Sequence, residues 1–141
     1  MDNKAKHIKT FTILLIITEF FNGLSGLAGG YGLIADPSAA SLGMELSWLE
    51  GTPFNTYLIP GIILIAFNGL GNTIAAILSL RKNKYMNGVA IFFGFGMMIW
   101  VASQVLWIGY KNFLQHLYFT TGLVQALLGL IIWNKMRAKI K

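Results

Sequence analysis

The sequence predicts an all-α transmembrane four-helix bundle, with both ends on the cytoplasmic side and one domain over residues 1–141. Two observations predict this class. Hydrophobic residues make up 55% of the chain and charged residues 11%, under half the charged share of a typical soluble domain. Four continuous apolar runs also reach the roughly 20 residues that a helix needs to cross about 30 Å of hydrocarbon. Lipid must therefore cover most of the surface.

The predicted spans cover residues 11–34, 57–80, 86–109 and 117–134. The first follows a basic start, as a signal peptide does, but its apolar run is longer than a signal-peptide core and contains Glu19. We therefore expect it to be retained as a helix. Strands of a membrane barrel are not expected, because such strands alternate apolar with polar residues over only about ten positions.

The orientation follows from the positive charges, which membrane proteins keep on the cytoplasmic side. Cytoplasmic termini place ten of the eleven Lys and Arg residues inside and only Lys111 outside. Nucleic-acid binding is not expected, because that function needs basic residues along one continuous face. The ten inside residues form three clusters at the ends of apolar runs: Lys4/Lys6/Lys9, Arg81/Lys82/Lys84 and Lys135/Arg137/Lys139/Lys141.

The external connection, residues 35–56, is predicted to contain a short amphipathic helix that lies on the outer interface. Asp36-Pro37 resembles a helix start. Leu42, Leu46 and Leu49 then recur at near-helical spacing beside Trp48, whose ring suits headgroup depth. Two interpretations stay open for this segment: a packed lid over the bundle, or a gate to a cavity.

Polar residues inside the spans are the most informative feature. At about 1.5 Å per residue, Glu19, Asn22, Asn68 and Gln125 fall at nearly the same mid-membrane depth, whereas Asn72 lies nearer the cytoplasm and Gln104 nearer the outside. Small residues share their helical faces, and small residues let membrane helices approach closely. We therefore expect these faces to point into the bundle.

Glu19 is the sharpest of these residues, because an ionised carboxylate is costly at that depth. No Lys, Arg or His lies within a predicted span to neutralise it. It is expected to be protonated, or to keep its charge only beside water or a bound cation. Two roles stay open: structural hydrogen bonding to Asn68 or Gln125, or proton coupling and ligand binding.

The sequence thus predicts a ligand site within the membrane and no catalytic, metal or cofactor site. The chain has no cysteine, and His7 and His116 lie on opposite sides of the predicted bilayer. The expected partners are membrane lipids, a small amphipathic ligand, and a second copy or another membrane protein. The predicted ligand-binding residues are Glu19, Asn22, Asn68, Asn72, Gln104, Trp107 and Gln125.

Several runs resemble those of small, uncharacterised four-span integral membrane proteins of bacteria. They are Asp36-Pro37-Ser38, Ser41-Leu42-Gly43-Met44, Glu50-Gly51-Thr52-Pro53-Phe54, Tyr57-Leu58-Ile59-Pro60-Gly61 and Gln104-Val105-Leu106-Trp107-Ile108-Gly109. The resemblance covers most of the chain from Asp36 onward. It implies a bacterial cytoplasmic membrane and no activity.

Three functions stay open. The leading one is binding of an amphipathic or lipid-like molecule in an intramembrane cavity around Glu19, Asn68 and Gln125, as a transporter or transporter subunit. The second is a structural or regulatory partner protein whose glycine-rich first helix docks another membrane protein. The third is a lipid-modifying enzyme with Glu19 as general acid or base; we expect no enzyme, because no second catalytic group is evident at that depth.

Overall fold

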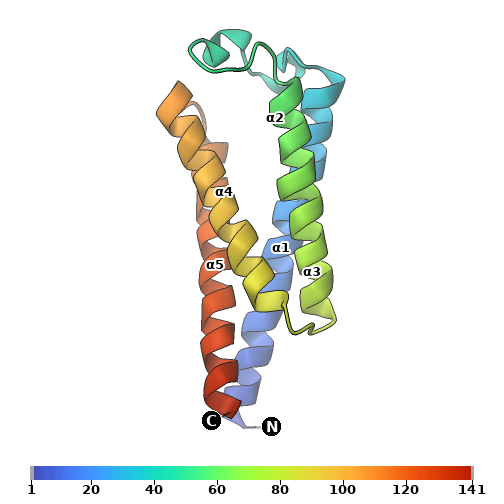
Figure 1. Cartoon of the computed structure of the whole chain (residues 1–141), viewed down its shortest axis with the longest axis vertical. Coiled ribbons are helices and arrows are strands. Elements are labelled where there is room, and N and C mark those ends of the chain that lie inside the picture. Colours follow the sequence, from blue (N-terminus) through green and yellow to red (C-terminus); the bar gives the residue numbers. More distant parts are fainter. Residues whose placement is uncertain (1, 141) are drawn as a thin grey trace.

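In the computed structural model, which describes residues 2–140, the four apolar runs form four long helices (Figure 1). Each is long and apolar enough to cross a membrane, as in a multi-pass membrane protein. They are α1 (Asn3–Ala35), a second helix made of α2 (Leu58–Ile63), η3 (Leu64–Gly71) and α3 (Asn72–Leu80), then α4 (Met86–Ile108) and α5 (Phe113–Ile140). Lys141 and the Lys139 side chain, both in the last basic cluster, lie outside the described part.

Two helices begin before their predicted spans because polar residues cap them. The Asp2 carboxylate accepts a hydrogen bond of 2.6 Å from the backbone N–H of Ala5, which starts α1 eight residues ahead of the apolar run. The side-chain oxygen of Asn112 accepts one of 2.9 Å from the N–H of Leu114 and starts α5. Hydropathy locates the membrane-crossing part of a helix, whereas capping decides where the helix begins.

The helices form two antiparallel pairs, α1 with α2–η3–α3 and α4 with α5, and α1 also packs against α5. Both termini lie at one end of the bundle, here called the terminal end, and the segment between α1 and α2 covers the other, the loop end (Figure 1). The pairs converge at the terminal end, where Leu15, Met86, Ala90, Leu128 and Ile132 form a buried cluster. Towards the loop end they diverge.

Glycines set the close approach within each pair. A Cβ on Gly26 of α1 would lie 2.7 Å from the backbone N of Gly69 in η3, and one on Gly94 of α4 would lie 2.7 Å from the carbonyl oxygen of Gly122 in α5. Such contacts require glycine. The glycine face of α1 therefore packs on η3, inside the same chain.

The helix η3 is a π-helical stretch within the second span. Pro60, one turn before it, is the third residue of α2, where its missing N–H removes no bond within the helix. The wider turn of a π-helix is often found at functional sites. Here the stretch contains Asn68, whose side chain is 3% exposed.

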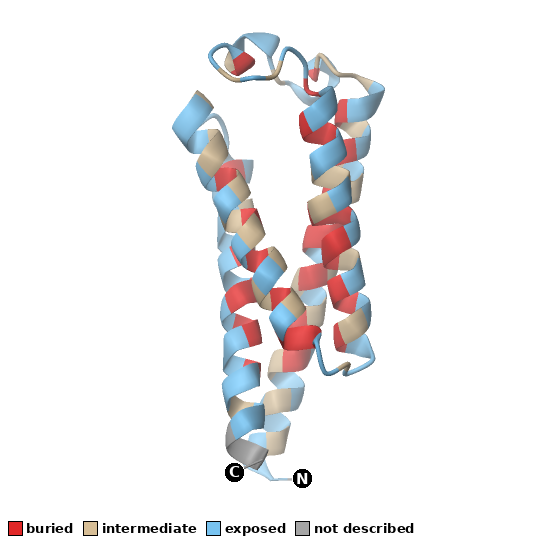
Figure 2. Cartoon of the chain, in the orientation of Figure 1, coloured by how far each residue is buried: buried red, intermediate tan, exposed pale blue. Residues whose placement is uncertain are grey.

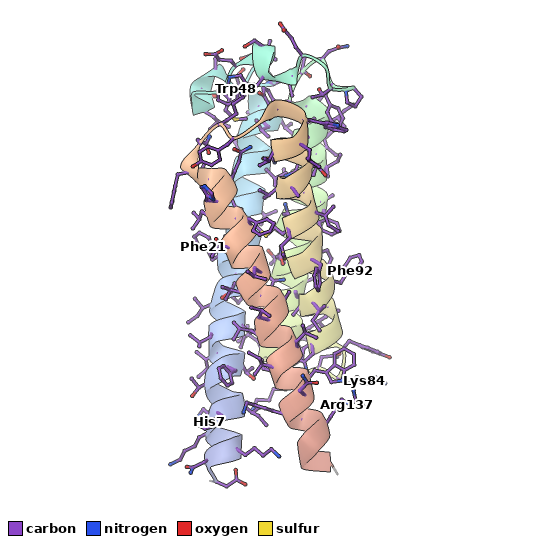
Figure 3. All side chains as sticks on the ribbon, turned by 90° about the vertical axis from the view of Figure 1, so that its left-hand side faces the viewer. His7, Phe21, Trp48, Lys84, Phe92 and Arg137 are labelled. Atoms are coloured by element: carbon purple, nitrogen blue, oxygen red, sulfur yellow. The ribbon has the colours of Figure 1, made fainter. Side chains whose placement is uncertain are left out.

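Burial is reversed relative to a soluble protein (Figure 2). Glu19 and Asn22 are fully buried, whereas Ile17, Phe92 and Ile99 are each 60% exposed or more. An apolar exterior with a polar interior suits hydrocarbon as the solvent. His7, Lys84 and Arg137 lie towards the terminal end and Trp48 at the loop end (Figure 3), so the labelled basic side chains gather at one end.

The connection between α1 and α2, called the cap (residues 36–57), differs from its prediction. In place of an amphipathic helix it contains two 3₁₀ turns, η1 (Ala40–Leu42) and η2 (Leu46–Leu49). Left-handed backbone at Ala39 (φ 59°) and Gly43 (φ 74°) bounds η1 on both sides, which stops an α-helix from continuing.

The Asp36 carboxylate organises the start of the cap. It accepts hydrogen bonds from the Ser38 hydroxyl (2.6 Å) and the Ser41 backbone N–H (3.0 Å), so it closes a turn rather than starting a helix. These bonds lower the pKa of Asp36 to about 2. Farther along, the Tyr57 hydroxyl donates to the carbonyl of Glu45 (2.7 Å) and ties the cap to the start of α2.

Candidate functional site

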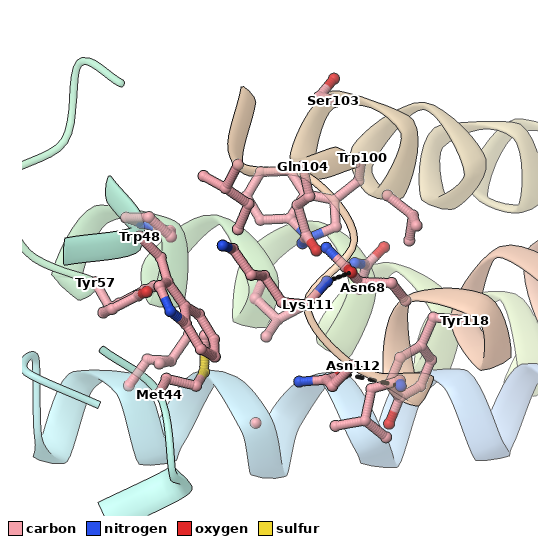
Figure 4. A pocket seen from close by; sticks show the side chains of 18 of the residues that line it. Met44, Trp48, Tyr57, Asn68, Trp100, Ser103, Gln104, Lys111, Asn112 and Tyr118 are labelled. Atoms are coloured by element: carbon pink, nitrogen blue, oxygen red, sulfur yellow. Dashed lines mark hydrogen bonds between the residues drawn. The ribbon is translucent and has the colours of Figure 1, made fainter. Parts of the chain in front are cut away.

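A cavity of about 360 Å³ lies between the two diverging helix pairs, under the cap. Most of its lining is apolar or aromatic, with a few polar groups, which is the usual composition of a small-molecule site. Figure 4 shows Met44, Trp48 and Tyr57 of the cap on one side and Asn68 of η3 on the other, with Lys111 between them. Residues of α1, α4 and α5, including Ser25, Trp100, Gln104 and Tyr118, complete the wall.

Two contacts join the cap to the opposite pair of helices at the mouth of the cavity. The Lys111 ammonium lies 5.5 Å from the centre of the Trp48 ring, within the range of a cation–π interaction. The Phe54 and Trp107 rings meet edge to face, with centroids 6.4 Å apart.

Gln115 holds the Lys111 backbone in place. Its side-chain oxygen accepts a 2.7 Å hydrogen bond from the N–H of Lys111, and its amide nitrogen donates to the carbonyl of Gly109 at 3.3 Å. Gln115 is 7% exposed and lines the cavity. The turn between α4 and α5 thus places one cation at the mouth.

Below the cavity, three amides cross-link the bundle. The Gln125 amide nitrogen donates to the side-chain oxygen of Asn72 (2.8 Å) and to the carbonyl of Ala90 (3.0 Å), and its oxygen accepts from the Asn22 amide (2.8 Å). Gln125 thereby joins α5 to α1, α3 and α4. All three amide side chains are fully buried. Because hydrocarbon supplies no hydrogen-bond partners, these amides depend on one another and on the backbone for their bonds.

Glu19 lies apart from this network. Its Oε1 accepts a hydrogen bond of 2.7 Å from the hydroxyl of Ser79 on α3. Glu19 and Ser79 are both fully buried, and Glu19 does not line the cavity. Its partner is a hydroxyl on α3, not the Asn68 or Gln125 amide considered from the sequence.

The seven predicted ligand-binding residues separate into two groups. Asn22, Asn68, Gln104 and Trp107 line the cavity. Glu19, Asn72 and Gln125 do not, and lie in hydrogen bonds between helices. Asn22 belongs to both groups, because its amide nitrogen binds Gln125 while its side chain lines the deep end of the cavity.

Sequence reasoning missed Trp48, Trp100, Lys111 and Gln115 as cavity residues. Only Lys111 had a feature in the sequence that could have indicated its place in the site: it is the single basic residue predicted on the outer side. Trp48 was expected at headgroup depth, and no pattern distinguishes Trp100 from a lipid-facing aromatic or Gln115 from a loop residue. Their shared site depends on how far the helix pairs diverge, which no local pattern encodes.

The arrangement suits binding of a molecule that is apolar along its length and polar at its ends. No Asp or Glu occurs among the described residues that line the cavity. The same residues include no acid paired with a base, which is the arrangement expected of a catalytic site. Comparison of the chain with protein-family models, curated proteins and solved structures finds no match.

Proposed function

We propose that this protein binds a small amphipathic molecule in the cavity beneath the cap, as a membrane binding protein or a transporter subunit. The observation that carries the proposal is the cavity itself: about 360 Å³, mainly apolar, with polar side chains at its mouth and at its deep end. Closely packed helices rarely leave a pocket of this size and composition, which supports a binding role.

The proposal includes an orientation. The loop end faces the outside and both termini face the cytoplasm of a bacterial cell, because the basic clusters that end the spans gather at the terminal end. The cavity then opens to the outer leaflet or the outer aqueous phase. An amphipathic molecule there keeps its charged group near the interface and its apolar part within the bundle.

Glu19 takes no part in the proposed binding. It lies outside the cavity lining and accepts a hydrogen bond from Ser79, which favours a structural role for this carboxyl group. Proton coupling and enzymatic use of Glu19 therefore lose support. The buried amides and Glu19 act in this proposal as the rigid base that supports the cavity.

The cavity supplies its own fluorescent reporters, because Trp48, Trp100 and Trp107 line it. The test uses 11-bromoundecanoic acid, whose bromine quenches nearby indole fluorescence, with the protein in zwitterionic lipid nanodiscs. We expect saturable quenching in the wild type. Trp133→Phe, at the far end of the bundle, removes the fourth tryptophan and isolates the signal from the cavity.

The decisive variant is Ser25→Phe, which fills the cavity from α1. Saturable quenching should disappear in Ser25→Phe and persist in Leu24→Phe, a matched control whose 58%-exposed side chain faces lipid. Quenching that rises linearly with the probe and equally in all variants would show partition into the bilayer alone, and would refute the proposal.

A further inference from the structure

The deep end of the cavity contains two buried oxygens for which the described residues supply no hydrogen-bond donor. They are the side-chain oxygens of Asn22 and Asn68, in residues that are 0% and 3% exposed. Both residues line the cavity. A buried acceptor without a donor carries a free-energy cost that a suitable ligand group would remove.

The orientation of the Asn22 amide is fixed by a backbone group. The carbonyl of Ala90 accepts only, so the Gln125 atom that contacts it at 3.0 Å must be the amide nitrogen. The Gln125 oxygen is then the atom that meets Asn22 at 2.8 Å, and it requires the Asn22 nitrogen as its donor. The Asn22 oxygen is therefore left as an acceptor, whichever way amides are assigned elsewhere.

Asn68 is not fixed in this way, so its amide offers both an acceptor and a donor at the deep end. A hydroxyl group suits such a pair of amides, because it donates one hydrogen bond and accepts others. A carbonyl or ether oxygen accepts only, and would leave both asparagine oxygens without a donor.

The mouth of the cavity favours a charged group on the ligand, in contrast to the uncharged hydroxyl favoured at the deep end. Lys111 is the single cation among the described lining residues, and no carboxylate accompanies it there. Its ammonium faces the Trp48 ring. An anionic group would be attracted to this position, whereas a cationic group would be repelled.

The spacing of the two ends sets the length of the occupant. Asn22 and Leu33 both line the cavity and lie eleven residues apart on α1, which corresponds to about 16 Å along the helix axis. The wall between them is built mainly from apolar and aromatic side chains, such as Leu64, Met97 and Trp100.

We propose that the cavity selects an anionic amphiphile that carries a hydroxyl group at the end opposite its charge, with the hydroxyl bound by Asn22 and Asn68 and the charge beside Lys111. This inference rests on the proposed function, because it names the class of molecule that fills the same cavity. A membrane phospholipid does not meet the requirement, since its charge and its headgroup hydroxyls lie at the same end.

Competition binding tests the proposal. Tritiated 12-hydroxydodecanoic acid is displaced from the protein in zwitterionic nanodiscs by unlabelled 12-hydroxydodecanoic acid, dodecanoic acid or 1,12-dodecanediol. We expect the hydroxy acid to bind about tenfold more tightly than dodecanoic acid, as one buried hydrogen bond provides. Equal affinity of these two acids would overturn the proposal.

Asn68→Leu removes the free amide without breaking a hydrogen bond of Asn68 to another described residue, so we expect it to fold. The tenfold preference for the hydroxy acid should fall to less than about twofold. Asn134→Leu is the matched control, since Asn134 is an exposed residue of α5 that lies outside both the cavity lining and the Gln125 network. It should retain the preference; an Asn68→Leu protein that also retains it would contradict the assignment of the hydroxyl site.

Lys111→Met tests the charge independently of the buried amides, at an exposed position. Both acids should bind about tenfold more weakly, whereas the uncharged diol should be unaffected. Lys135→Met is the control, because Lys135 also lies over an aromatic ring, Phe11, but at the terminal end. Equal weakening of the diol and the acids would contradict a charge-specific role.

The two proposals fail in different ways. If 11-bromoundecanoic acid quenches saturably and Ser25→Phe abolishes this, but the hydroxyl and the charge confer no preference, the cavity binds amphiphiles and the selectivity inferred here is wrong. If no probe binds saturably, the binding function itself is refuted.

Discussion

At the scale of single residues, the interior of this bundle depends on which polar atoms find partners. Gln125 satisfies its amide with three partners on three other helical segments. Asn68 occupies a similar environment but leaves its oxygen without a donor. Two buried amides of the same chemistry therefore differ in their bonding: Gln125 joins helical segments, whereas the Asn68 oxygen has no donor among the described residues.

The structural role of Gln125 is tested by Gln125→Leu. This change keeps the approximate volume but leaves the Asn22 amide, the Asn72 oxygen and the Ala90 carbonyl without their partner, so the free energy of unfolding should fall by about 2–4 kcal/mol. Unfolding by dodecyl sulfate in mixed micelles, followed by circular dichroism, measures it. Gln104→Leu, in the cavity wall, should change stability by less than about 1 kcal/mol; equal losses would refute the special role of Gln125.

At the scale of helices and connecting segments, contact distance and local turns decide the geometry. The α1–η3 pair is close because glycines meet there, and the pair as a whole tilts away from α4 and α5 towards the loop end (Figure 1). The cap then bridges the two pairs through Trp48 and Phe54. The cavity is the space that this combination leaves.

Glycine substitutions separate packing from helix propensity. In Gly26→Ala the new Cβ would approach the Gly69 backbone to 2.7 Å, so α1 and η3 must move apart and stability should fall by about 1–3 kcal/mol. In Gly88→Ala the new Cβ meets nothing within 4 Å, and the better helix propensity should give a gain of up to about 1 kcal/mol. Melting temperatures in detergent would show the opposite signs; a loss in Gly88→Ala would contradict the prediction.

The cap should loosen in acid. The pKa of Asp36 is about 2 in the folded chain, below its usual value of about 3.9, so its hydrogen bonds stabilise the cap fully above pH 4. This contribution is lost as the pH falls from about 4 through 2, because the carboxylate is then protonated in both states.

The rate of pepsin cleavage within residues 37–56 measures this loosening. Between pH 4 and pH 2 cleavage should accelerate more in the wild type than in Asp36→Asn, which cannot titrate. The nearby Glu45 and Glu50 are present in both proteins, so the difference isolates Asp36. Identical pH profiles would show that Asp36 does not stabilise the cap.

At the scale of the whole molecule, most basic residues and the cavity lie at opposite ends of the bundle. Basic residues surround the terminal end, whereas the cavity and its single lysine lie under the cap at the loop end. With the proposed orientation, the cavity would open towards the outer leaflet or the outer aqueous phase. The orientation of the chain therefore decides from which side of the membrane a ligand would reach the cavity.

Cysteine accessibility tests the orientation, because the chain has no cysteine of its own. Ser47→Cys, in the cap, should react with a membrane-impermeant maleimide added to intact cells. Asn83→Cys, in the turn between α3 and α4, should react only after the membrane is opened. Labelling of Asn83→Cys in intact cells, with Ser47→Cys protected, would invert the topology and remove the proposed access from outside.

The sequence alone determined the helices, because each must satisfy its own backbone in lipid and so needs an unbroken apolar run. It also identified Glu19, Asn22, Asn68, Asn72 and Gln125 as interior residues, since polar groups avoid hydrocarbon. Local patterns erred in the cap, where the spacing of Leu42, Leu46 and Leu49 suggested a helix but left-handed backbone at Ala39 and Gly43 gave two short turns.

Only the tertiary structure decided which interior residues share a site. Depth along a helix follows from counting residues, but the lateral distance between helices depends on glycine contacts such as Gly26 with Gly69 and on the divergence of the two pairs. Glu19 and Asn68 were therefore predicted together by depth, yet one bonds Ser79 between helices and the other lines the cavity. Trp48 and Lys111, far apart in sequence, meet because the cap crosses the mouth. Which residues contact one another in a bundle depends on how the helices pack, and the packing involves all the helices at once.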